Sequence, residues 1–174
     1  MAKGSKREGG GIGELLAYAG DRKFLTYLGM ALSAFSQLLS FGPYVCIWLV
    51  ARDLIAVAPN WSEACDIAMY GWWAVGFALA SIVAYFVGLM CTHLSAFRCA
   101  SNIRKATSEH LLKLPLGYFD THATGELRRI VDGCAASTET LLAHMLPDIA
   151  GATAMVAGLL VLLFASIGAW ARHA

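Results

Sequence analysis

The sequence predicts an all-α membrane protein with three transmembrane helices, of which the second and third extend into a helical hairpin on the cytosolic side. One observation is composition: 58% of the 174 residues are apolar and only 14% are charged, which exceeds what one small soluble core can bury. Another is the presence of three runs without Asp, Glu, Lys or Arg, at 24–51, 67–97 and 149–171. Each run exceeds the roughly 20 residues that an α-helix needs to cross a bilayer.

The basic residues are the third observation, and they set the expected orientation. Five Lys or Arg residues precede Phe24, one follows the first run, and six lie in the hairpin, 98–148. By the positive-inside rule, the N-terminus and the hairpin face the cytosol and the C-terminus lies outside, with the plasma membrane of a bacterium as the expected location. The tryptophans fall at the opposite ends of the runs, as an interfacial belt requires: Trp48, Trp61, Trp72, Trp73 and Trp170.

Residues 1–23 are expected to form a cytosolic tail and an interfacial helix. The segment 12–23 alternates apolar and charged residues, which is typical of a short helix lying on the inner membrane surface. In the first run, Pro43 is expected to kink the helix. Polar residues recur there at helical spacing, and they either face a substrate cavity or bond neighbouring helices: Ser33, Ser36, Gln37 and Ser40.

The second run carries small residues at strict four-residue spacing: Gly76, Ala80, Ala84 and Gly88. Such a seam lets another helix approach closely, so we expect these residues to pack against a neighbouring span. The third run repeats the pattern more weakly, at Ala150, Ala154 and Gly158.

The hairpin is predicted to be a pair of antiparallel helices. The descending arm has no Pro or Gly before Pro115, and the returning arm, 126–146, has apolar residues at helical intervals. Pro147 is expected to mark a bend where the chain re-enters the membrane.

The hairpin tip, 116–127, places Tyr118 and Phe119 at the far end of the arms. Asp120 is expected to cap a short helix beginning at Thr121, and Gly125 to supply the turn into the returning arm. The aromatic pair either docks into a groove of a partner or folds back on the leucines of the arms.

No catalytic, cofactor-binding or metal site is predicted in this chain. The five cysteines form no CxxC pair. A membrane-embedded enzyme using His93 or His144 with Asp148 is a remote alternative, because no metal-ligand spacing or nucleophile arrangement supports it.

At the hairpin the sequence resembles the first transmembrane block of the ATP-binding cassette (ABC) exporters with six helices per half-transporter. The residues that carry the resemblance are Leu112-x-Leu-Pro-Leu-x-Tyr-Phe-Asp120, Thr124-Gly-Glu-Leu-x-x-x-Val131-Asp132 and Leu142-x-His-x-Leu-Pro-Asp148. The patterns Leu116-Gly-Tyr-Phe119 and His144-Met-Leu-Pro-Asp148 are also similar to the branch of that family that handles iron-siderophore complexes.

The resemblance implies that the hairpin tip is the first coupling helix, which contacts a nucleotide-binding domain. The residues expected at this contact are Tyr118, Phe119, Asp120, Thr124, Gly125 and Glu126. ATP and Mg are expected in a nucleotide-binding domain elsewhere, because no G-x-x-x-x-G-K-[ST] occurs in this chain, which alone is not expected to hydrolyse ATP. Expected partners are that domain, the remaining transmembrane helices, a dimeric assembly and the lipid bilayer, with no nucleic acid.

Residues 24–174 are therefore expected to be a partial transporter transmembrane domain, without its nucleotide-binding domain. Two alternatives stay open: a stand-alone three-helix membrane adaptor or regulatory subunit, and a non-functional truncated transporter fragment. A neighbouring reading frame with three more hydrophobic spans and a phosphate-loop domain would favour the transporter.

Overall fold

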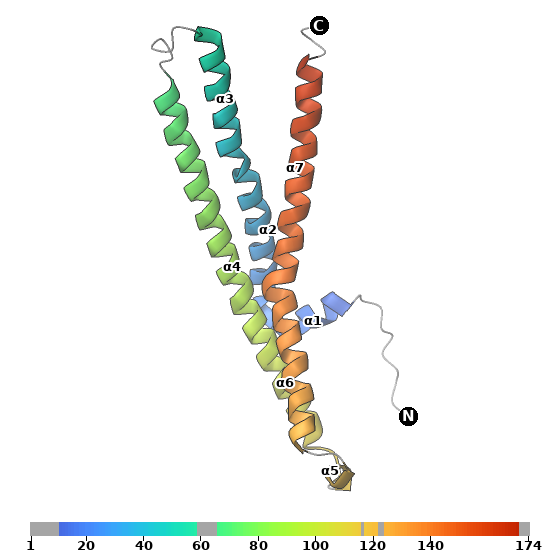
Figure 1. The fold of residues 1–174 in the computed structure, drawn as a ribbon. Helices are drawn as coiled ribbons and strands as arrows, with labels where there is room; N and C mark the ends of the chain where they lie inside the picture. The colour runs from blue at the N-terminus through green and yellow to red at the C-terminus, as the bar shows by residue number, and fades with distance from the viewer. Residues whose placement is uncertain (1–10, 59–65, 116, 122–123, 171–174) are drawn as a thin grey trace. The chain divides into compact units, whose positions relative to one another are not determined.

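The computed structural model describes residues 11–58, 66–115, 117–121 and 124–170, and every element in these ranges is helical (Figure 1). In chain order the elements are α1 (Gly11–Ala19), η1 (Gly20–Arg22), α2 (Lys23–Leu39), α3 (Phe41–Val57), α4 (Ile67–Leu111), α5 (Gly117–Thr121), α6 (Thr124–Thr140), the π-helical turn η3 (Leu141–Met145) and α7 (Leu146–Trp170). Three helical stretches, 11–57, 67–111 and 124–165, are long and apolar enough to cross a membrane. The predicted all-α class with three spans is confirmed.

The chain divides into two compact units, which are described separately. The hairpin unit comprises 1–28 and 91–146, so it holds α1, the second half of α4 and the elements from α5 to η3. The span unit comprises 29–90 and 147–174, which includes most of α2, all of α3, the first half of α4 and nearly all of α7.

In the hairpin unit, α1 lies against one face of α4. Three α4 side chains spaced as i, i+4 and i+7 donate to backbone carbonyls of the N-terminal segment: Ser95 Oγ to Arg22 O at 3.1 Å, Cys99 Sγ to Leu15 O at 3.2 Å, and Asn102 Nδ2 to Tyr18 O at 2.7 Å. Gly20 ends α1 with a left-handed φ of 59°, which only glycine adopts without strain. A helix is thus present in the segment where the interfacial helix was predicted, but it ends before Gly20.

The first span is interrupted at Ser40. Pro43 cannot donate a hydrogen bond to the carbonyl oxygen of Leu39, and its ring crowds that carbonyl, so α2 ends at Leu39 and α3 begins at Phe41. The sequence places the end of this span at residue 51, but α3 continues to Val57 and carries the Arg52–Asp53 ion pair of 3.0 Å.

The packing row of α4 in the span unit differs from the predicted seam. Gly88 is buried, and a Cβ added to it would lie 3.0 Å from the Cβ of Leu32 on α2. A Cβ on Gly76 would meet no described atom within 4 Å, and Ala80 is exposed. Four residues advance an α-helix by about 400°, so each step of the seam drifts by about 40° and its two ends face different directions.

The residues of α4 that contact the first span lie on a single face of the helix. Phe77 lies against Gly42 of α3, Ser81 Oγ donates to Ser36 O at 3.0 Å, and Gly88 lies against α2. Spacings of four and seven residues keep these three positions on one face of the helix.

The π-helical turn lies directly before Pro147. In this turn the N–H of Leu146 bonds the carbonyl oxygen of Leu141, five residues earlier. A residue with an N–H at position 147 would bond Ala143 O in an α-helix, but proline has none. The Thr92 hydroxyl of α4 donates to Ala143 O instead, at 3.1 Å.

Candidate functional site: the hairpin tip and a polar pocket

The end of the hairpin is built differently from the prediction. The descending arm α4 ends at Leu111, earlier than the expected stop at Pro115. The short helix α5 begins at Gly117 and ends at Thr121, so the predicted start at Thr121 is wrong; Pro115 O accepts a hydrogen bond from Tyr118 N at 2.9 Å and so closes the turn before it. Gly125 lies inside the first turn of α6, not in a turn before it.

The two aromatic side chains of α5 are half-buried and contact each other. The ring centroids of Tyr118 and Phe119 are 5.7 Å apart, with the planes at 89°. Edge-to-face pairs of this kind are favourable for aromatic rings. The pair therefore gives the short α5 an internal contact in addition to its few backbone hydrogen bonds.

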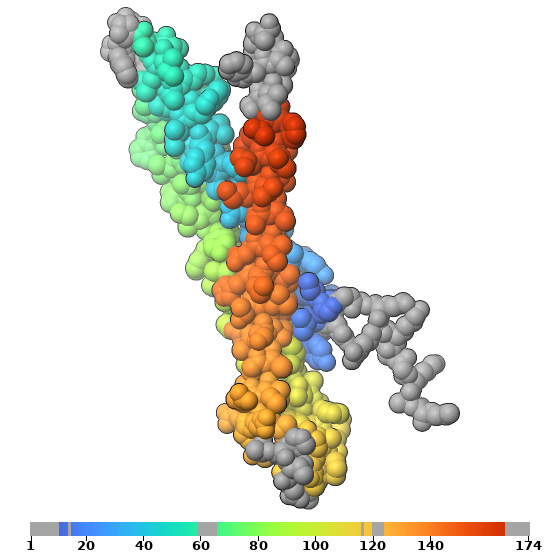
Figure 2. Space-filling model, turned by 45° about the vertical axis from the view of Figure 1, so that its right-hand side comes forward, coloured from blue at the N-terminus to red at the C-terminus, as the bar shows by residue number. Residues whose placement is uncertain are grey.

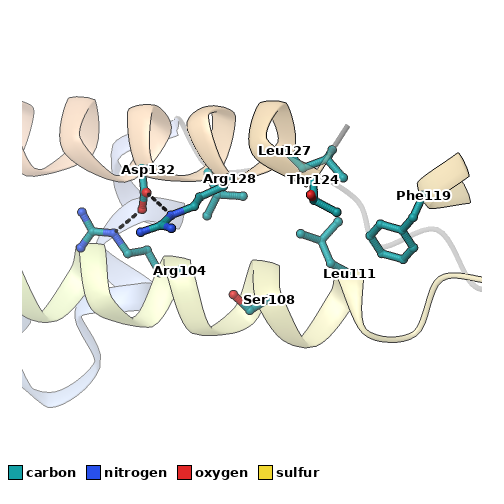
Figure 3. Close-up of a pocket in the computed structure, with 9 residues that line it drawn as sticks. Arg104, Ser108, Leu111, Phe119, Thr124, Leu127, Arg128 and Asp132 are labelled. Carbon is teal, nitrogen blue, oxygen red and sulfur yellow. Dashed lines mark ion pairs between the residues drawn. The ribbon is translucent and has the colours of Figure 1, made fainter. Parts of the chain in front are cut away.

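A cavity of about 390 Å³, here called the tip pocket, opens between the two arms beside α5. Its lining residues come from both arms and from α5: Arg104, Ser108, Leu111, Phe119, Thr124, Leu127, Arg128, Val131 and Asp132. Phe119 points from α5 toward Leu111 and Thr124 (Figure 3). For Phe119, the interpretation in which the ring folds back on the arms is therefore the one observed.

The tip pocket carries two cations and one anion. Asp132 lies between Arg104, whose Nε is 3.4 Å from Oδ1, and Arg128, whose Nε is 3.6 Å from Oδ2 (Figure 3). These groups are 42–86% exposed, so each ion pair contributes at most about 1 kcal/mol. The cluster holds the arms together weakly and leaves one net positive charge in the pocket.

The residues predicted for a coupling contact lie near one another at the end of the hairpin. Tyr118 and Phe119 are on α5, and the exposed residues Thr124, Gly125 and Glu126 form the first turn of α6. Asp120 belongs to α5, but its side chain lies outside the described residues. Figure 1 shows α5 at the far end of the two arms, α4 and α6, and Figure 2 shows the atoms of the arms from a view turned by 45°.

The sequence did not indicate Leu112 as a surface residue. Its side chain is 84% exposed. The adjacent Leu111 lines the tip pocket, whereas Leu112 is not among the lining residues. Exposure of a large apolar side chain beside the tip extends the candidate docking surface to Leu112.

His93 of α4 and His144 of η3 are brought into ring contact, which the sequence did not predict. Their ring centroids are 4.8 Å apart, and the planes meet edge to face at 81°. Fifty-one positions separate the two residues in the chain, so no local motif could signal the pair. Among the described residues, no group of three or more His, Cys, Asp or Glu side chains is arranged to hold a metal ion.

The span unit contains a second cavity, here called the polar pocket, of about 470 Å³. It lies between α2, α4 and α7 and is lined by Ser33, Ser36, Gln37, Ser81, Ile82, Tyr85, Asp148, Gly151, Ala152 and Met155. A Cβ added to Gly151 would lie 3.0 Å from Ser33 Oγ and 3.2 Å from Gln37 Cγ. The absence of a side chain at Gly151 therefore lets α7 lie close to the polar face of α2.

The two interpretations of the polar residues in the first span apply to different residues. Ser33 Oγ donates to Pro147 O at 2.8 Å, which is an interhelical hydrogen bond. Ser36 and Ser40 donate to carbonyls of their own helix, at 3.1 and 2.6 Å. The Gln37 side chain lines the polar pocket. Of these four residues, only Gln37 has a polar side-chain group that lines the cavity without donating a hydrogen bond to a described residue.

Comparison with known proteins gives one family and two curated relatives. The family model described as ABC transporter transmembrane region matches residues 26–170. The mycobactin import ATP-binding/permease protein IrtA of Mycobacterium tuberculosis is 26% identical over 137 residues, which are 79% of this chain and 16% of the relative. Its namesake of Mycolicibacterium smegmatis is 27% identical over 137 residues, 76% of this chain and 15% of the relative. The chain thus spans about a sixth of the length of these relatives, and no solved structure matches it significantly.

Proposed function

Because the chain belongs to the ABC transporter transmembrane-region family, we propose that it forms part of a substrate translocation path and docks an ATP-binding domain through the hairpin tip. The family and the three long apolar helices make it an integral membrane protein. In the proposed orientation the hairpin faces the cytosol, where such a domain binds ATP and Mg. The chain itself supplies docking and the path, and ATP hydrolysis belongs to its partner domain in a dimeric assembly.

The observation that carries the docking proposal is the placement of α5 at the end of two long helical arms. The edge-to-face pair of Tyr118 and Phe119 stabilises α5, and Phe119 anchors it in the tip pocket. Because α5 is packed against the arms, a displacement of α5 would also move α4 and α6. The exposed first turn of α6, with Glu126, adds a charged edge to this surface.

The proposal is tested by affinity purification of the tagged chain from its native membranes in mild detergent. Wild type is expected to retain a polypeptide with a phosphate-loop ATPase domain, identified by mass spectrometry. Tyr118→Ala/Phe119→Ala and, separately, Glu126→Lys are expected to lose it. Glu126 is exposed, so its replacement tests docking without disturbing the packing of the arms.

The matched control is Ile130→Ala, because Ile130 is a half-exposed apolar residue of α6 about one turn beyond Glu126. This variant is expected to retain the ATPase domain. Absence of any such domain, from membranes in which the chain is stable, would refute docking and favour a separate adaptor or an inactive fragment. Equal capture by wild type and all tip variants would place the contact elsewhere.

A further inference from the structure

The polar pocket lies level with the middle of the predicted spans. Gln37 is at the midpoint of the charge-free run 24–51, and Ile82 is at the midpoint of the run 67–97. Asp148 lines the same pocket as these two residues. A bilayer that covers the first two runs therefore also surrounds Asp148, although the sequence pattern places this residue just outside the third run.

Three polar side chains of the pocket have no partner within the described part of the chain. The Asp148 carboxylate makes no ion pair or hydrogen bond there, and neither do the Gln37 amide and the Tyr85 hydroxyl. Asp148 and Tyr85 are exposed, Gln37 is half-buried, and all three residues line the polar pocket. In contrast, the Ser33 and Ser36 hydroxyls are already used in hydrogen bonds.

An unpaired carboxylate inside a bilayer is unfavourable, and such residues usually face a water-filled cavity or a ligand path. The structure also removes one ordinary explanation, which is favourable placement at a helix N-terminus. The helix of Asp148 is continuous with η3, whose C-terminal flank Leu146 bonds back to Leu141, so Asp148 does not lie at an isolated helix N-terminus.

We propose that the polar pocket binds an organic cation, with the Asp148 carboxylate as its counter-ion. The Gln37 amide and the Tyr85 hydroxyl supply hydrogen bonds, and the side chains of Ile82 and Met155 cover the apolar part of the ligand. The volume of about 470 Å³ is within the range of pockets that hold drug-sized molecules. This inference rests on the proposed function, because it assigns a ligand class to the path.

The lining residues disfavour an inorganic cation. Asp148 is the one carboxylate among them, whereas Ca²⁺ takes six to eight oxygen ligands and Mg²⁺ near-ideal octahedral coordination. Transition metals favour His and Cys ligands, and none lines this pocket. A singly charged organic cation needs only one carboxylate as counter-ion, and its apolar surface can contact the side chains of Ile82 and Met155.

The test measures binding of rhodamine 6G, an amphipathic cation, by fluorescence polarisation to the protein purified with its native partners into lipid nanodiscs. Empty nanodiscs correct for partition into lipid, and a sulfonated fluorescein serves as the anionic probe. Wild type is expected to bind the cation saturably and the anion at least about tenfold more weakly. Asp148→Asn, which keeps the shape and removes the charge, is expected to weaken cation binding at least about tenfold.

The control for charge alone is Asp53→Asn. Asp53 is an acid of the same unit that pairs with Arg52 and does not line the pocket, so its replacement is expected to leave binding unchanged. Gln37→Leu is expected to weaken binding several-fold. Absence of saturable binding, equal binding of both probes, or full affinity in Asp148→Asn would each overturn the proposal.

Failure of this inference is distinguishable from failure of the docking proposal. Asp148→Asn is expected to retain the ATPase domain in affinity purification, and Tyr118→Ala/Phe119→Ala to retain cation binding. Loss of both properties in either variant would indicate unfolding, which circular dichroism and gel filtration of the purified protein detect. In that case Gln37→Leu, which removes the amide without altering charge, decides the pocket proposal by its effect on cation affinity.

Discussion

The hydroxyl of Thr92 donates a 3.1 Å hydrogen bond to the carbonyl oxygen of Ala143, the acceptor that Pro147 leaves without its α-helical donor. One side chain of α4 thus satisfies a backbone group that the proline of α7 cannot. Both Thr92 and Ala143 are buried, so an unsatisfied carbonyl there would be costly. The proline and the threonine therefore act as a pair, although they lie on different helices.

This pairing predicts a non-additive double-mutant cycle. Thr92→Val removes the hydroxyl at nearly constant volume and is expected to destabilise the protein by about 1 kcal/mol. In a Pro147→Ala background the new N–H can bond Ala143 O, so the same replacement is expected to cost less than half as much. Denaturant unfolding of the four variants in mixed micelles measures the coupling, and strictly additive effects would contradict the pairing.

The glycines of α4 are expected to respond differently to alanine. At Gly88 the new Cβ would lie 3.0 Å from Leu32 Cβ and 3.1 Å from Gly29 O, a backbone atom that cannot rotate away. Gly88→Ala is expected to destabilise by roughly 1–3 kcal/mol. Gly76→Ala meets no described atom within 4 Å and is expected to leave stability unchanged or raise it by up to about 1 kcal/mol.

Thermal unfolding of the two glycine variants in the same detergent makes this comparison. Each variant adds one methyl group to the same helix, so a difference in melting temperature between the two variants reflects packing and not added hydrophobicity. Equal melting temperatures would show that Gly88 is not in a close helix contact.

Asn102 is expected to hold α1 in place. Asn102→Ala removes the 2.7 Å bond to Tyr18 O, and a loss of about 1 kcal/mol corresponds to roughly fivefold more frequent local opening. Hydrogen exchange followed by mass spectrometry is expected to show faster exchange across 11–19. Ser101→Ala is the control, since Ser101 is exposed and donates no hydrogen bond among the described residues.

Leu112 is expected to matter for binding but not for folding. Its side chain is 84% exposed, so Leu112→Ser is expected to change the melting temperature little while reducing capture of the ATPase domain. Leu111→Ser is the matched variant, because Leu111 lines the tip pocket and its loss is expected to destabilise the hairpin. Unchanged capture by Leu112→Ser would remove this residue from the docking surface.

The positions of charged residues and prolines predicted most of the fold. Runs without charge locate the helices because an unpaired charge is unfavourable in lipid, and Pro43 and Pro147 mark interruptions because proline lacks an N–H. Element ends were less predictable. Arg52 and Asp53 pair with each other on one helix, and that compensation, which lets α3 continue past them, is invisible in a list of charges.

The arrangement of the site depended on contacts between distant segments. Of the predicted seam, Gly88 packs against α2 and Gly76 meets no described atom, because four-residue spacing drifts around a helix, whereas Phe77, Ser81 and Gly88 lie on one face. Asp148 looked like the edge of a span until its neighbours on α2 were known. The family patterns located the tip, but only coordinates show that Phe119 turns inward.

The bonds between α4 and the N-terminal segment have a consequence for how freely that segment can change during evolution. All three acceptors are main-chain carbonyls, those of Leu15, Tyr18 and Arg22, and the donors are side chains of α4. A carbonyl is present whatever the residue, so substitutions in 11–19 leave these bonds possible. The outer surface of α1 can therefore change while the bonds that fix its position are kept, because the donors of those bonds belong to α4.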